Sequence, residues 1–163
     1  MKPLIFSLFL TLAFFESGCV SVNLGPGKTG KANEVKFTEP DGAFRRVNNA
    51  SADRAWQSHK TGNTISFFSE CPESEGSLQS ISDDFLTVLK DSHVTGRTSD
   101  FFNGRESLDL QAEGKIDGID MKVSTLVFKR NGCSYLLSYV SRQDRFETEH
   151  QQYLGFLKSF RAP

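Results

Sequence analysis

The sequence predicts an α+β fold in which an antiparallel β-sheet of hairpins and a meander carries helices packed on its faces. Two observations predict this class. Asp117-Gly118 and Asn131-Gly132, dipeptides that type I′ hairpin turns prefer, separate runs in which apolar and polar residues alternate. Residues 77–93 and 144–160 instead repeat apolar residues every three or four positions, as amphipathic helices do. Consecutive strands joined by tight turns favour an antiparallel sheet over a parallel one.

The chain begins with a hydrophobic run that resembles an export signal. Residues 4–15 are apolar except for one serine and one threonine, a length typical of a signal peptide core and too short to span a bilayer. The run leads into Ser17-Gly18-Cys19, which resembles the lipobox of bacterial lipoproteins, although Glu16 stands where that motif usually has an aliphatic residue. The resemblance implies that residues 1–18 are a signal peptide and that Cys19 carries a lipid. An ordinary signal peptide that releases a soluble protein is the alternative.

Lipid attachment at Cys19 implies a place in the cell envelope, where the lipid is the contact with the membrane. Val20 and not an aspartate follows the cysteine, which by resemblance to the sorting of enterobacterial lipoproteins favours the outer membrane. Residues 19–33 are rich in glycine and lack an apolar period, which predicts a flexible tether. Residues 34–163 are then predicted to form a single globular domain that faces the periplasm or the exterior.

Two hairpins are predicted at the start of this domain. Residues 35–37 and 43–47 flank a Pro-Asp-Gly turn, and residues 54–60 and 64–69 flank a second turn that contains glycine. Trp56, the only tryptophan, is expected in the core of the second hairpin.

A helix is predicted over residues 77–93, with Ser77 as its N-cap. Its apolar stripe consists of Leu78, Ile81, Phe85, Val88 and Leu89, and Asp83 and Asp84 are expected on the solvated face.

A three-stranded meander is predicted next, over residues 107–113, 118–129 and 133–141. The middle strand is apolar on both faces at its far end, so both faces of the sheet are expected to be covered. The final helix is predicted to begin with a capping box formed by Asp144 and Glu147.

This order of elements resembles the Mog1/PsbP-like fold over residues 35–160. The resemblance is carried by the strand Tyr135-Leu136-Leu137-Ser138-Tyr139 and by the helix end Leu157-Lys158-Ser159-Phe160. Proteins of this group include photosystem assembly proteins, a small-GTPase binder and bacterial envelope lipoproteins. The resemblance therefore implies an α/β/α sandwich and favours binding over catalysis, but it carries over no active site.

Three cysteines become two if Cys19 is lipidated. Export would place Cys71 and Cys133 where disulfides persist, so we expect them to form a bridge. Two separate buried thiols are the alternative.

Composition and motifs argue against several classes of function. The 19 basic and 20 acidic residues nearly balance, without a basic stripe, so nucleic acid is not an expected partner. His59, His93 and His150 fall on separate elements, so neither a metal site nor a cofactor is expected. No nucleophile motif is found, so no catalytic residue is nominated.

One stretch has the composition of an interaction surface. Arg97 and Arg105 bracket Phe101 and Phe102 in a segment expected to be a loop, and arginine with aromatic residues is typical of protein interfaces. The sequence thus predicts a membrane-anchored envelope lipoprotein that acts as a non-catalytic binding or assembly module, with an envelope protein as its partner. A small envelope hydrolase with an unrecognised active site is the alternative.

Overall fold

The computed structural model describes residues 30–48, 51–72 and 76–163. The expected signal peptide, Cys19 and most of the expected tether therefore lie outside the described residues. The described elements are β1 (Phe44–Val47), β2 (Arg54–Ser58), β3 (Thr64–Glu70), α1 (Leu78–Leu86), β4 (Lys90–Phe102), β5 (Arg105–Ile116), β6 (Ile119–Arg130), β7 (Cys133–Arg142), a 3₁₀ turn (Gln143–Arg145) and α2 (Phe146–Ser159).

Seven antiparallel strands form one sheet in the order β1-β2-β3-β7-β6-β5-β4. The predicted α+β class is confirmed, and so is the meander of β5, β6 and β7. Asp117-Gly118 and Asn131-Gly132 have positive φ at both positions, as type I′ turns require. A third turn of this kind, Asn103-Gly104, joins β4 to β5.

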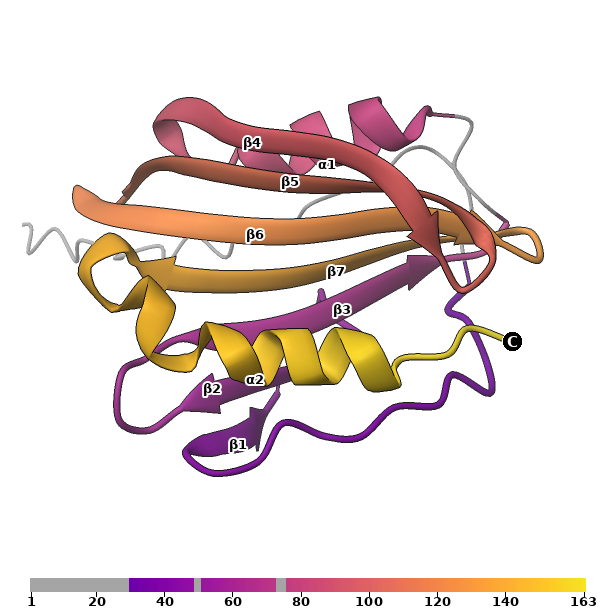
Figure 1. Ribbon diagram of the computed structural model, residues 1–163, viewed down its shortest axis with the longest axis horizontal. Helices are drawn as coiled ribbons and strands as arrows, with labels where there is room; N and C mark the ends of the chain where they lie inside the picture. Colours follow the sequence, from indigo (N-terminus) through magenta and orange to yellow (C-terminus); the bar gives the residue numbers. More distant parts are fainter. Residues whose placement is uncertain (1–29, 49–50, 73–75) are drawn as a thin grey trace, which may run out of the picture.

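The two helices cover opposite faces of the sheet (Figure 1), as the resemblance to an α/β/α sandwich implied. Helix α2 packs on β7 over an aromatic core, and α1 packs on β5 and β6 over a smaller aliphatic core. Trp56 is 1% exposed within the aromatic core, as expected. Each helix covers a different half of the sheet, which leaves the α2 side of β4 and β5 open.

Helix α1 is shorter than predicted, because it ends at Leu86 and the chain enters β4 at Lys90. His93, expected at the helix end, is therefore a strand residue. Val88 and Leu89 still pack against the aliphatic core, which explains why the apolar period continues past the helix. The crossing of this connection over β5 requires Gly114, where a Cβ atom would lie 2.9 Å from the Lys90 carbonyl oxygen.

The prediction of a first hairpin between residues 35–37 and 43–47 is wrong. Strand β1 pairs with β2, whereas Lys36 exchanges backbone hydrogen bonds of 3.0 and 2.7 Å with Arg161 near the C-terminus. The structure also differs from the expected tether at its end, because Gly30 exchanges backbone hydrogen bonds of 2.6 and 2.9 Å with Cys71. Contacts between distant parts of the chain decide the pairing of Lys36 and of Gly30. The local turn residues from which the hairpin and the tether were predicted carry no information about such contacts.

The start of the last helix also differs from the prediction. Helix α2 begins at Phe146 after a 3₁₀ turn, and its N-cap residue Arg145 makes no side-chain capping bond. Asp144 pairs with Arg142 (3.1 Å) instead of capping the helix.

A disulfide joins Cys71 and Cys133, as expected from the even pair of cysteines, with the Cα atoms 4.5 Å apart. It lies one position beyond the last backbone pair of β3 and β7, Glu70 with Ser134.

Candidate interaction surface

The predicted contact residues lie on a strand edge and not in a loop. Arg97, Phe101 and Phe102 belong to β4, and Arg105 begins β5 after the Asn103-Gly104 turn. The prediction of a loop is therefore wrong, since the alternation that marks a strand is missing from a segment that is exposed on both faces. Residues 90–101 are all exposed, and β4 is the last strand of the sheet.

The two phenylalanines point to opposite faces, as adjacent strand residues must. Phe101 is 78% exposed, whereas Phe102 is half-buried and packs edge-to-face on Phe128, with ring centroids 5.1 Å apart. Arg97 lies on the α1 side, where its guanidinium binds Asp83 at 2.6 Å. Arg97 and Phe101 share that side, because four residues separate them in a regular strand, while Arg105 pairs with Phe102 on the other.

The tip of the β4–β5 hairpin is held by the C-terminal segment. The Asn103 amide donates to the Phe160 carbonyl (3.1 Å) and its amide oxygen accepts from the Ala162 N–H (3.3 Å). The guanidinium of Arg130 donates to the Asn103 carbonyl. The hairpin is therefore a fixed platform for the residues on β4.

An open groove of about 320 Å³ runs between α2 and the uncovered half of the sheet. Of the residues that line this groove, only Arg97 is a contact residue predicted from the sequence, because the others have the polar spacing of an ordinary solvated strand or helix. Its polar lining residues include Arg97, Thr98, Asp109, Gln111 and Ser124 on the strands and His150 on α2, and Tyr153, Leu154 and Leu157 complete the wall on α2.

Asp109 and His150 in this groove are both shifted toward their neutral forms. Burial, with a smaller contribution from the Asp100 carboxylate, raises the pKa of Asp109. Burial also lowers the pKa of His150, although the Glu147 carboxylate opposes this effect. The buried Nε2 atom of His150 has no hydrogen-bond partner among the described residues. The groove can offer hydrogen bonds to a ligand.

A second polar cluster is structural. The Glu149 carboxylate on α2 accepts hydrogen bonds from the β2–β3 turn, from Ser58 Oγ (2.7 Å), Thr61 Oγ1 (2.5 Å) and Asn63 Nδ2 (3.0 Å). Asn63 also donates to the Tyr139 hydroxyl at 2.9 Å. We call these four contacts the Glu149 clamp, since three of them tie the second hairpin to α2 and the fourth ties it to β7. Nothing local in the sequence marks the residues involved, which lie far apart in the chain.

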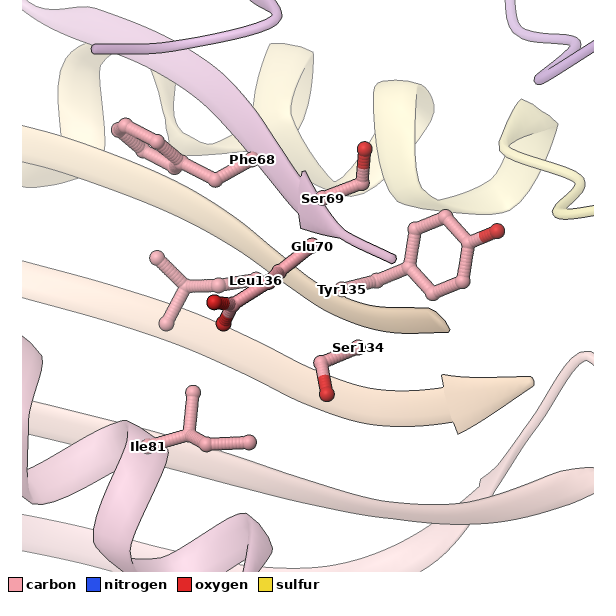
Figure 2. Close-up of a pocket in the computed structure, with 7 residues that line it drawn as sticks. All are labelled: Phe68, Ser69, Glu70, Ile81, Ser134, Tyr135 and Leu136. Carbon is pink, nitrogen blue, oxygen red and sulfur yellow. The ribbon is translucent and has the colours of Figure 1, made fainter. Parts of the chain in front are cut away.

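The pocket beside Glu70 is too small for a ligand. Figure 2 shows the Glu70 carboxylate directed toward Leu136 and Ile81, on the side of the sheet that α1 covers. The cavity has a volume of about 20 Å³, which is room for about one water molecule. Burial raises the pKa of Glu70, because the charged carboxylate is less well solvated there than in water.

Within residues 30–48, 51–72 and 76–163, no three His, Cys, Asp or Glu side chains are grouped so that they could hold a metal ion. Cys71 and Cys133 are both in the disulfide, so neither is a thiol nucleophile. Neither α1 nor α2 combines the length and the apolar character needed to cross a membrane.

Comparison with known proteins gives similarity at the level of the fold. No protein-family model matches the sequence, and no curated protein matches it. Among solved structures, the chain is similar to LpqN of Mycobacterium tuberculosis, described as involved in cell envelope biogenesis, with a TM-score of 0.62 and 14% identity over 85% of this chain and 87% of that one. It is also similar to CyanoP, the cyanobacterial PsbP of Synechocystis sp. PCC 6803, with a TM-score of 0.58 and 14% identity over 91% of this chain and 99% of that one. The chain therefore has a PsbP-like α+β fold, as expected from the sequence.

Proposed function

We propose that this protein is a lipid-anchored module of the bacterial cell envelope that binds a protein partner and does not catalyse a reaction. The observation that carries the proposal is the β4 edge, which we define as the outer side of Lys90–Phe102. Its residues through Phe101 are all exposed, and Phe101 is a large apolar side chain that is 78% exposed on a hairpin fixed from behind. Exposed apolar residues on a rigid edge are typical of protein interaction sites.

Three further observations support the envelope location. The Cys71–Cys133 disulfide is of a kind that forms and persists in exported proteins. The sequence before Cys19 resembles a lipoprotein signal, and Val20 after the cysteine favours the outer membrane over the inner one. LpqN, which shares the fold, is itself described as involved in cell envelope biogenesis.

Lipid attachment is tested by labelling cells with radioactive palmitate. The wild type is expected to incorporate label and to sediment with membranes, and Cys19→Ala is expected to lose the label and appear in the soluble fraction. Equal, poor labelling of both proteins, with both in the soluble fraction, would show that there is no lipid anchor.

Partner binding is tested by crosslinking the full-length protein in its own cells. Phe101→Ala should reduce capture of the partner, whereas Ile119→Ala should not. Ile119 is the matched control because it is also an exposed apolar strand residue, at 49%, but lies on β6. Unchanged capture by Phe101→Ala would remove the β4 edge from the proposal.

A further inference from the structure

The two edges of the sheet differ in length and regularity. Strand β1 has four residues, whereas β4 has thirteen. Edge strands carry N–H and C=O groups that lack a neighbouring strand, and a long edge is therefore able to accept one. Two register shifts interrupt the pairing of β4 with β5, both before Gly96. They leave one regular run, Gly96–Phe102, which extends to the hairpin turn and has Ser99 at its centre.

The backbone groups that face outward in this run can be assigned. The N–H of Phe101 donates to the carboxylate of Asp100 at 2.7 Å, so it does not point at β5. Antiparallel ladders alternate between residues that bond to their neighbour strand and residues that do not. Ser99 and Arg97, two and four residues earlier, therefore also direct their N–H and C=O groups outward.

We infer that the β4 edge pairs with the β4 edge of a second copy of this chain, an inference that rests on the proposed function because it names the partner of the same surface. Two copies related by a two-fold axis through the Ser99 pair overlap over the whole regular run. Arg97 then lies opposite Phe101 of the second copy, and Ser99 lies opposite its own equivalent. The outward groups of these three residues meet outward groups, which gives about six backbone hydrogen bonds in an antiparallel ladder.

The side chains of this register are self-complementary. Arg97 and Phe101 share the α1 side, so each arginine meets the aromatic ring of the other copy, a cation–π pair. On the α2 side Thr98 lies opposite Asp100, whose carboxylate is released from the Phe101 N–H and can accept from the threonine hydroxyl. Gly96 lies opposite Phe102 and leaves space for the ring, since nothing occupies the position of its missing Cβ. The run carries one positive and one negative residue, so two copies do not repel.

The small size of this contact suits a protein that is anchored to a membrane. Seven paired residues make a small interface, which binds weakly between free molecules. Two copies held on one membrane meet at a much higher effective concentration, so a weak edge contact is enough for assembly.

The register is tested with cysteine pairs in the full-length protein in cells. Thr98 and Asp100 of the second copy are a pair that does not bond through the backbone, with Cα atoms about 4.5 Å apart, within reach of a disulfide. Copies carrying Thr98→Cys and Asp100→Cys under different tags are expected to form a linked dimer, identified by mass spectrometry of the joined peptides. Either variant alone should not link, because like positions are diagonal neighbours about 7–8 Å apart.

Ser99→Pro in both copies is the substitution expected to disrupt the pairing of the two β4 edges without disrupting the fold. Proline is tolerated on an edge strand where the N–H faces solvent, so the ladder with β5 and the melting temperature should be preserved. The two central intermolecular bonds are lost, and the yield of linked dimer should fall roughly tenfold or more. An Arg45→Cys variant on the exposed β1 edge controls for random collisions and should not link.

Three results would overturn the inference: equal linking in the single variants, linking that Ser99→Pro leaves unchanged, or no linking in a folded protein. A photocrosslinking residue at Phe101 separates this failure from that of the proposed function. Capture of a different protein without self-linking overturns the second copy as partner and supports the proposed function. Absence of any capture and of self-linking overturns both.

Discussion

Removal of the Cys71–Cys133 disulfide is expected to cost about 4 kcal/mol of unfolding free energy. The bridge spans a sequence separation of 62 residues, and the loss of chain entropy in the unfolded state gives this value for a loop of that length. The folded state should change little, because the seven backbone pairs of β3 and β7 hold the same two strands together up to Glu70 and Ser134. The effect is therefore expected on the unfolded chain.

The double variant Cys71→Ala, Cys133→Ala is compared with the wild type by denaturant unfolding. Trp56 fluorescence is a suitable probe, since this is the only tryptophan and is 1% exposed in the folded state. A loss of about 4 kcal/mol corresponds to a fall in melting temperature of roughly 10–15 °C for a chain of this size. Wild-type protein treated with a reductant should unfold like the double variant. A difference below about 1 kcal/mol would refute the chain-entropy argument, and loss of the native fold at low temperature would show that the β3–β7 ladder needs the bridge.

Three other predictions, two of them with a matched control variant, test the assignments of buried and exposed groups. Glu149→Ala should lower the free energy of unfolding by about 3 kcal/mol in denaturant titrations, because it leaves three donors of the Glu149 clamp without their acceptor. Glu147 is exposed, so the control Glu147→Ala should change the free energy of unfolding by less than about 0.5 kcal/mol. Equal effects of the two substitutions would contradict the clamp. Glu70→Gln should raise the melting temperature at neutral pH. Burial raises the pKa of Glu70 above 4.5, so the folded state binds the proton more tightly than the unfolded state does. The stability that this gives is present below the unfolded pKa and is lost as the pH rises through the folded pKa. A melting temperature that falls with pH as steeply in the variant as in the wild type would contradict this reasoning. Phe102→Ala should cost about 2 kcal/mol in unfolding free energy because its ring packs on the core, and Phe101→Ala should cost less than about 0.5 kcal/mol; the reverse order would show that the faces of β4 are assigned wrongly.

The strands that sequence analysis placed well are those whose signals are local. The Asp117 and Asn131 turns sit at the predicted positions because positive φ at two successive residues is a demand that Asn, Asp and Gly meet best. The segment from Arg97 to Phe102 was misread as a loop for the opposite reason. An edge strand that is exposed on both faces has no apolar alternation, so its strand character comes only from pairing with β5.

The candidate surface was likewise predictable only where its signal is local. Arg97 and Phe101 were found from composition, and the structure places both on the α1 side of β4. The groove with Asp109 and His150 was missed, because it forms only where α2, from a position far along the chain, lies beside β5, and burial there is the largest cause of the pKa shift of each group.

The sequence by itself determined the α+β class, the antiparallel meander, the two cysteines available for a bridge and the resemblance to a lipoprotein signal at Cys19. Each of these depends on residues that are close together or on simple counts. The tertiary structure alone decided that β4 is an edge strand of the described sheet, that α1 ends at Leu86, and that the chain near Lys36 runs beside the C-terminus. These features depend on which distant segments pack together. The free energy of such contacts depends on the packing of the folded domain, and no local pattern of residues reports it.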